Sequence, residues 1–348
     1  MSLVERLSAA FGHQKSKTLP KILDRMFSKE ELRILTSLPS TPAEIGEKFG
    51  EDESKIVKTL QNLYMRGVVV ISDFKREKPV YSIPSDAGLC IDLTLFDRRY
   101  SSDQELLDML DKFHNEEYIQ SYDSKEEHIF RVIPVEKEIQ APPSVILPYE
   151  KISEIVKDAR IIVVQQCPCR TRARRCDNPQ EICLSLDHVA DYILSRGIGR
   201  EVSKEEAMAL LNQAENLGLV HQTTNTSKVD VVCNCCTCCC SLLSAYVHFG
   251  KKMATIQSRY RAVVNHEACN SCGLCLARCH FGALSFENGK PFIWKERCMG
   301  CGLCASKCPV DAISLRPVQP ENHIPVSDES YGYSLGKLPR SAYTRPND

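Results

Sequence analysis

The chain has 348 residues, of which 43% are hydrophobic and 26% are charged, and its formal net charge is −1. This length predicts roughly two to four domains, and the balanced charge excludes a general attraction to nucleic acid or anionic lipid. No apolar run approaches the roughly 20 residues that cross a bilayer, and the N-terminus is a poor secretory signal, so we expect a soluble cytoplasmic protein without membrane insertion.

Residues 1–85 are predicted to form an N-terminal helix and a small helical domain. Ser28 with Glu31, and Thr41 with Glu44, match the capping-box pattern that begins a helix. The patterns predict helices over 3–11, 28–38, 41–49 and 52–66, and strands over 68–72 and 79–83 around a polar turn at 73–78. Three helices and a hairpin in this order resemble a winged helix-turn-helix domain.

The charge of this domain favours a protein-docking role over DNA binding. Residues 26–85 carry nine basic and nine acidic side chains, and the third helix begins with Glu51, Asp52 and Glu53. A DNA reader needs cations on its reading helix and wing. Basic side chains do occur on both elements, so DNA binding stays open as the disfavoured alternative; they are Lys55, Lys58 and Arg66 on the helix, and Lys75, Arg76 and Lys78 on the wing.

Residues 86–155 are predicted to be a connector. A helix is expected over 101–113, and the stretch 133–148 contains four prolines, which predict extended backbone. Cys90 stands apart from every other cysteine, so we expect a buried apolar residue there rather than a ligand.

Residues 156–250 are predicted to form an α/β domain with cysteines at the ends of its strands. Strands are expected over 160–165, 219–222 and 228–232, and helices over 187–195 and 203–217. The first strand leads into Cys167 and the last into Cys233, so the scaffold can bring both cysteine groups together. The chain as a whole is predicted to be an α+β multidomain protein.

The strongest chemical signal is an internal repeat in residues 258–318. Two C-x2-C-x2-C-x3-C runs begin at Cys269 and Cys298, 29 residues apart. This spacing resembles the bacterial two-cluster ferredoxins, because three thiolates wrap one cube while the fourth reaches the other cube. A zinc alternative is disfavoured because zinc sites present separated C-x2-C pairs. The resemblance implies two 4Fe-4S clusters, one held by Cys269, Cys272, Cys275 and Cys308, the other by Cys298, Cys301, Cys304 and Cys279.

One position departs from the ferredoxin pattern. His280 follows Cys279 where the family usually has proline, whereas Pro309 keeps the pattern after Cys308. The histidine is interpreted as a solvated side chain, with an effect on the potential of the nearby cluster as the alternative.

Ten further cysteines lie in the middle domain, and three interpretations compete for them. They favour one or two additional iron–sulfur clusters over structural zinc and over a thiol-based redox or storage site. Clustered cytosolic cysteines indicate metal ligands or redox groups rather than disulfides. The first segment is assigned mainly to one site and the second to another, with mixed ligation equally open; the residues are Cys167, Cys169, Cys176 and Cys183, then Cys233, Cys235, Cys236, Cys238, Cys239 and Cys240.

Arginines follow the first cysteine pair. Arg170, Arg172, Arg174 and Arg175 fall within six residues. Cations there raise the potential of a nearby cluster or hold an anionic substrate, and the alternative is a solvated loop with salt bridges. His221 and His266 also lie near cysteine groups, where a satisfied core or surface role is expected.

The whole layout resembles a group of multidomain 4Fe-4S proteins of anaerobic bacteria and archaea. In that group a CPCR segment and a CNCC-x-CCC run precede a ferredoxin domain, and the matching residues here are 167–170 and 233–240. The resemblance implies the architecture and cofactor class but no substrate. Residues 319–348 are expected to be an extended tail.

We therefore expect an iron–sulfur electron-transfer protein. Single electrons would pass between a redox partner, such as an oxidoreductase subunit, a ferredoxin or a flavoprotein, and the middle-domain centres. One alternative is a reductase whose active site is the middle-domain cluster, and a second is a redox-responsive DNA-binding regulator. Whether the chain is an enzyme stays open, and no catalytic residue is assigned.

Overall fold

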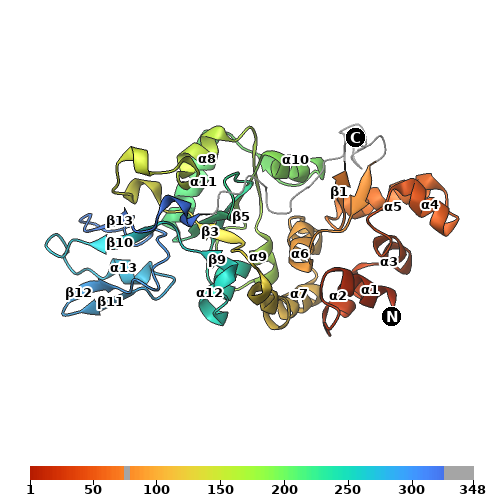
Figure 1. The fold of residues 1–348 in the computed structure, drawn as a ribbon, viewed down its shortest axis with the longest axis horizontal. Coiled ribbons are helices and arrows are strands. Elements are labelled where there is room, and N and C mark those ends of the chain that lie inside the picture. Colours follow the sequence, from red (N-terminus) through yellow and green to blue (C-terminus); the bar gives the residue numbers. More distant parts are fainter. Residues whose placement is uncertain (74–78, 325–348) are drawn as a thin grey trace.

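The computed structural model describes residues 1–73 and 79–324. It places a group of helices at the N-terminal end, a sheet in the middle and small β-ribbons at the other end (Figure 1). Most of the predicted wing turn, with Lys75, Arg76 and Lys78, lies outside the described residues, as does most of the predicted tail over 319–348. In the described ranges, no helix is long and apolar enough to cross a membrane.

The N-terminal group has helices followed by an antiparallel hairpin. Ser28 and Thr41 cap their helices as predicted, each accepting a hydrogen bond from the N–H three residues on. One helix, with Pro20 in its first turn, was not predicted from the sequence. The elements are α1 (Leu3–Ala10), α2 (Leu19–Met26), α3 (Lys29–Leu35), α4 (Pro42–Phe49), α5 (Glu53–Met65), β1 (Val70–Asp73) and β2 (Val80–Ser82).

The segment 86–155 does more than connect. Its last part, 133–150, is extended apart from short 3-10 turns, as its prolines predict. Its first part folds into helices that pack on the middle of the molecule and supplies one strand of the central sheet. These elements are α6 (Ala87–Leu95), α7 (Gln104–Glu116), the 3-10 helix η2 (Tyr118–Ser124) and β3 (Phe130–Val132).

The central sheet has seven strands in the described chain, and nearly all of them pair antiparallel. Only β3 and β9 run parallel. The predicted α/β domain is therefore corrected to α+β. The chain passes from β4 through α9 to β5, and β4 and β5 pair antiparallel, whereas an α/β fold would join parallel strands by a crossover helix. The spatial order is β6 (Arg200–Glu201), β4 (Ile162–Gln166), β5 (Glu181–Leu186), β8 (Val231–Cys235), β7 (Val220–Thr224), β3 and β9 (Thr255–Ile256).

Five helices of this part surround the sheet or lead away from its strands. The predicted helix at 187–195 forms over those residues, and the one predicted at 203–217 forms with Ser203 as its cap. The helices are α8 (Ile152–Asp158), α9 (Pro168–Ala173), α10 (Asp187–Ser195), α11 (Lys204–Asn216) and α12 (Ser241–Phe249).

The C-terminal unit is built on two antiparallel pairs. The outer pair, β10 (Tyr260–Val264) with β13 (Ile313–Pro317), brackets both cysteine loops, and the hairpin of β11 (Leu284–Glu287) with β12 (Lys290–Ile293) separates them. The short helix α13 (Leu274–Ala277) carries Cys275. The two halves of the sequence repeat are thus folded as one unit.

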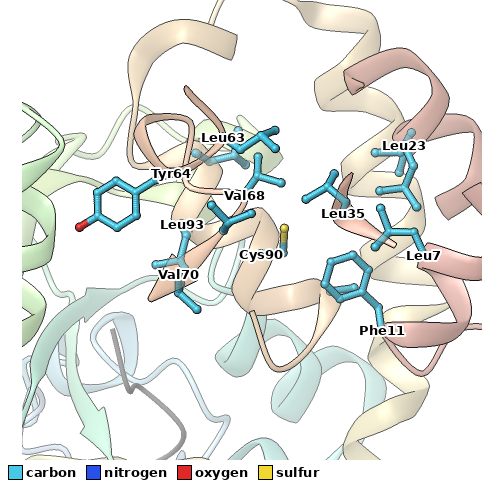
Figure 2. Packing of buried hydrophobic residues seen from close by; sticks show 14 of the residues in the cluster. Leu7, Phe11, Leu23, Leu35, Leu63, Tyr64, Val68, Val70, Cys90 and Leu93 are labelled. Atoms are coloured by element: carbon cyan, nitrogen blue, oxygen red, sulfur yellow. The ribbon is translucent and has the colours of Figure 1, made fainter. Parts of the chain in front are cut away.

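The largest hydrophobic cluster lies in the N-terminal half and extends to α10. Figure 2 shows Cys90 of α6 among Leu35, Val68 and Leu93. The Cys90 side chain is 8% exposed, and burial raises the pKa of its thiol to about 12. Cys90 therefore packs as an apolar residue, as its isolation in the sequence predicts.

Candidate metal centres

The C-terminal unit brings the cysteines of its two loops together. A void of about 20 Å³ is lined by Cys298, Cys301 and Cys304 of the second loop and by Cys279 of the first. This is one of the two sets of four that the ferredoxin resemblance implies. In the other set, Cys308 packs against the same hydrophobic cluster as Cys275, whose pKa is raised by burial and by the charges of Cys272 and Cys269.

Backbone N–H groups point at the sulfurs in a repeated way. The N–H of Ala283 lies 3.3 Å from Cys279 Sγ, and the N–H of Ala312, one repeat later, lies 3.2 Å from Cys308 Sγ. Such hydrogen bonds stabilise iron-bound thiolates and set cluster potentials. The two sets of thiols and their repeated N–H donors therefore fit two thiolate-ligated cubes.

His280 contacts the protein rather than solvent. Its Nε2 atom lies 2.6 Å from the carbonyl oxygen of Gly218, just beyond the end of α11. Arg278 donates to carbonyls of the same helix end, at Glu215 and Asn216. The solvated histidine expected from the sequence is therefore corrected: His280 helps to fasten the first cysteine loop to the central sheet domain.

Six middle-domain thiols form a closed ring, which we call the thiol ring. The pKa of each thiol is shifted by its interaction with two others, so these interactions run around the ring without a gap. The ring combines thiols of both cysteine segments, an arrangement that would suit the mixed ligation left open by the sequence. In order around the ring, its members are Cys167, Cys169, Cys240, Cys235, Cys233 and Cys183.

Strand geometry explains the ring. Cys233 and Cys235 are two residues apart on β8 and so share a face of the sheet. The antiparallel register that pairs Leu184 with Val232 sets Cys183 beside Cys233. Cys167 caps α9 where β4 ends, and Cys240 caps α12.

The other four thiols form a second group, which we call the thiol tetrad: Cys176, Cys236, Cys238 and Cys239. Their sulfur atoms all lie within 4.8 Å of one another. The chain turns after β8 ends, which carries Cys236 and the next two cysteines away from the ring and toward Cys176. Cys176 therefore lies with cysteines of the second segment, and not with Cys167, Cys169 and Cys183, with which the sequence analysis grouped it. The contact with Cys239 lowers the pKa of Cys236 to about 4, against the opposing effect of burial.

The arginines after the first cysteine pair divide into two kinds. Arg170 and Arg172 are buried, at 1% and 3% exposure, which excludes a solvated loop for these two. Arg174 and Arg175 are more exposed and pair with Asp108 and Asp111 of α7. Arg172 also pairs with Asp111, at 3.7 Å, so the salt-bridge interpretation describes Arg172 as well as the second pair.

Arg170 lies between the thiol ring and the thiol tetrad. Its guanidinium donates to the carbonyls of Pro179 and Asn234, at 3.0 and 2.6 Å. Burial lowers its pKa, but the charges of ring and tetrad thiols, Cys167 and Cys236 among them, raise it above the ordinary value. The side chain thus compensates negative charge in both groups.

A cavity of about 450 Å³ opens beside the thiol ring. All six ring cysteines line it, and α6, α7 and η2 supply part of the remaining wall. A single water needs only roughly 10–15 Å³ of such space, so the volume suits a bound group of substantial size. Sequence reasoning missed these walls, because it assigned 86–155 to a connector.

Polar side chains face the cavity near Cys169. Burial raises the pKa of Asp92 well above its ordinary value, and Cys169 raises it further. Burial lowers the pKa of His114 to about 3, and its Nε2 has no hydrogen-bond partner among the residues that the structure describes. Asp92 is the one charged residue within the apolar helix α6, a signal that could have identified it. Burial therefore favours the protonated form of Asp92 and the neutral form of His114.

The two other histidines near cysteine groups, His221 and His266, occupy a core and a surface position. His221 is 4% exposed, and its Nδ1 lies 2.6 Å from Asn234 Oδ1, so it is satisfied within the sheet. His266 is exposed. Both agree with the core and surface roles expected from the sequence.

The thiol ring and the C-terminal unit share a hydrophobic contact. Cys235 and Cys240 of the ring belong to the same cluster of packed side chains as Met299 and Leu303, with Cys301 against it. The N–H of Val135 also donates to the carbonyl of Cys301, at 2.9 Å. The void lined by Cys298, Cys301, Cys304 and Cys279 is therefore joined to the ring through packed protein.

Taken together, the fold and the thiols define a mixed α+β iron–sulfur protein with additional cysteine groups at its centre. Residues 262–315 match the family model of the 4Fe-4S dicluster domain. No curated protein and no solved structure matches the chain. The dicluster domain points to 4Fe-4S clusters and to electron transfer.

Proposed function

We propose that this chain carries single electrons between a redox partner and an iron–sulfur centre in the thiol ring, through the two clusters of the dicluster domain. The observation that carries the proposal is the shared packing of Cys301 with Cys235 and Cys240. Thiolate-ligated cubes exchange one electron each, and the protein tunes their potentials through hydrogen bonds and charge. In this proposal the protein holds the dicluster clusters and the ring centre close enough for electron transfer and excludes water from them.

The outer end of this route is suited to a partner protein. Cys272 is exposed, unlike Cys275 and Cys304. Large apolar side chains near the first loop are also exposed, including Leu274 at 50% and Trp294 at 43%. Exposed apolar surface beside a redox centre is typical of a docking site for an electron donor or acceptor. We infer that a small redox protein docks there.

Anaerobic purification and stepwise reduction test this proposal. We expect about eight irons from the dicluster domain alone, further iron from the ring, and EPR signals of reduced cubes. Replacing Cys301 with Ala should slow reduction of the ring centre by a protein donor, while replacing Cys90 with Ala should not. Fewer than four irons per chain would exclude the proposal.

The cavity supports a second candidate, a reductase that acts on a small molecule beside the ring. Electrons would come from the ring centre, and Asp92 is placed to give a proton, since burial raises its pKa and favours its protonated form. Small ligands such as azide or cyanide should then change the EPR spectrum of the ring centre in the native chain. An unchanged spectrum with every ligand, and normal turnover after replacing Cys235, would exclude it.

For the N-terminal elements we propose a winged-helix-like module that docks on protein. Lys55 of α5 already pairs with Glu30 and Glu51, at 2.7 and 3.0 Å, which reduces its availability to phosphates. Tyr64, near the end of α5, contacts Ser195 of α10 at 2.7 Å. A lack of duplex binding at low salt would agree with this role, whereas salt-dependent binding would favour the regulator.

A further inference from the structure

The thiol tetrad has a spacing of its own. Cys176 Sγ lies 3.8 Å from Cys236 Sγ and 3.7 Å from Cys239 Sγ, and Cys238 Sγ lies 3.8 Å from Cys239 Sγ. Within the described ranges, no other group of three or more Cys, His, Asp or Glu side chains has its ligand atoms within 4.8 Å of one another. The four sulfurs thus form a compact, closed arrangement.

These three sulfur–sulfur distances equal the edge of a tetrahedron around one metal ion, and the other three are at most 4.8 Å. Zinc–thiolate bonds are about 2.3 Å long, and a regular tetrahedron of that radius has edges of about 3.8 Å. A cube instead places each thiolate on a different iron, which carries the sulfurs further apart. The dicluster cysteines serve as the comparison within this chain, because their sulfurs do not gather within 4.8 Å.

The positions of Cys238 and Cys239 also favour a single metal ion over a cube. Cys238 and Cys239 are neighbours in the chain, and neighbouring side chains normally diverge. Here the turn after β8 holds both sulfurs at 3.8 Å. Two thiolates that close suit one shared ion better than two irons of a cube.

The surroundings fit a closed structural site. Cys239 is fully buried and Cys236 is 4% exposed. The Asn178 amide lies 3.3 Å from Cys176 Sγ, as an outer hydrogen-bond donor to a metal-bound thiolate would. All four tetrahedral positions are supplied by the chain, which leaves no open position for a substrate.

We propose that Cys176, Cys236, Cys238 and Cys239 bind one zinc ion rather than an iron–sulfur cube. Tetrahedral four-sulfur sites select zinc or iron–sulfur centres, and the spacing excludes the cube. The ion ties the segment after α9 to the turn after β8, and so fixes the wall shared with the thiol ring. This proposal does not depend on the proposed electron-transfer function.

Metal and sulfide analysis of the full chain, prepared without oxygen, tests the proposal. Cys176→Ser should remove one zinc per chain and leave iron and acid-labile sulfide unchanged. Cys183→Ser, in the thiol ring, should lower iron and sulfide and leave zinc unchanged. This variant therefore tests the proposed iron–sulfur centre of the ring independently of the zinc site. Cys90→Ala is the control and should change neither metal. Loss of iron with sulfide from Cys176→Ser, or no metal loss at all, would overturn the proposal.

A measurement on the unaltered chain covers the case in which a variant fails to fold. X-ray absorption at the zinc edge should show one zinc with four sulfur neighbours at about 2.3 Å. Absence of zinc, or a shell containing nitrogen or oxygen, would overturn the proposal.

Discussion

Arg170 carries an enclosed positive charge whose surroundings are almost wholly thiols and carbonyls. Within residues 1–73 and 79–324 its Nε has no hydrogen-bond partner, and its other nitrogens donate to carbonyls. A buried cation without a carboxylate partner is costly unless nearby anions compensate it. If the proposed metal centres hold the ring and tetrad thiols as thiolates, these thiolates supply the compensating anions, and Arg170 and the centres stabilise one another.

Replacing Arg170 with Gln should make the ring centre harder to reduce. One charge at a few ångströms in a partly screened interior changes the potential by on the order of 100 mV, here toward more negative values. Redox titration followed by EPR measures the shift. Arg174→Gln, in the same segment but paired with Asp108 at the surface, is the control and should leave the potential near its original value. Equal shifts in the two variants would contradict the role given to Arg170.

His114 should make folding stability fall in mild acid. Its pKa is about 3 in the folded chain because it is buried, whereas an unfolded histidine titrates near 6.5. Below pH 6.5 the unfolded chain therefore takes up a proton that the folded chain does not, and stability falls until about pH 3. Between pH 7.5 and 5 this lowers the free energy of unfolding by about 2 kcal/mol.

The measurement compares anaerobic denaturation of the native chain and His114→Phe at both pH values. The variant should lose about that part of the pH dependence, and its remaining dependence reports the other groups. The same dependence in both proteins would show that His114 is not held neutral.

At the scale of elements, β8 explains why a single run of cysteines serves two sites. Its alternation turns Cys233 and Cys235 to one face, and the turn that follows sends Cys236 the other way. The sequence allowed the prediction that strands end in cysteines, because the apolar runs before Cys167 and Cys233 are local signals. It did not allow the partition into ring and tetrad, which depends on the register of β5 against β8.

The same limit applies to α6 and the cavity. The isolated Asp92 is visible in the sequence, but its place opposite the thiols follows from packing between distant elements. The dicluster loops were predictable because ligand spacing there is local. The capping boxes at Ser28 and Thr41 were predictable for the same reason.

The second cysteine loop depends on Gly300. Its φ is +66°, and a Cβ there would lie 2.1 Å from the carbonyl oxygen of Tyr260. Gly300→Ala should cost more than about 3 kcal/mol or abolish binding of the cluster held by that loop, since backbone cannot yield cheaply. Iron content and thermal unfolding check this.

Gly289 in the β11–β12 turn is the matched control. Its φ is +74°, but nothing lies within 4 Å of a Cβ placed there. Gly289→Ala should therefore cost only about 1 kcal/mol, from the unfavourable φ alone. Similar losses at the two glycines would show that close approach at Gly300 is unimportant.

At the scale of the whole molecule, the extended segment 133–150 fastens the dicluster domain to the sheet. Glu150 binds Arg259 through both carboxylate oxygens, at 2.6 and 2.8 Å, and accepts from Tyr260 at 3.0 Å. All three side chains are buried. Gln140 adds a backbone bond to Leu315 at 2.8 Å. The domain is thus held by polar contacts as well as by apolar packing.

Glu150→Gln should destabilise this attachment by about 3–5 kcal/mol, because Arg259 is left as a buried charge without its partner. Chemical denaturation measures the loss, and limited proteolysis should release the dicluster domain earlier. Glu154→Gln removes a surface carboxylate whose partner Lys157 is 71% exposed, and should change little. An unaffected Glu150→Gln would mean that packing alone holds the domain.

Residues 233–240 supply cysteines to both the thiol ring and the thiol tetrad. Metal binding at one group therefore changes the conformational entropy that is lost when metal binds at the other. An ion in the tetrad fixes the turn from which Cys240 enters the ring, so the ring then closes with less conformational freedom left to lose. Maturation of the apo-chain therefore has a preferred order, with the single ion loaded before the larger inorganic core. Depriving cells of that ion would then slow the loading of the ring, although the ring still reaches its full iron content when iron is plentiful.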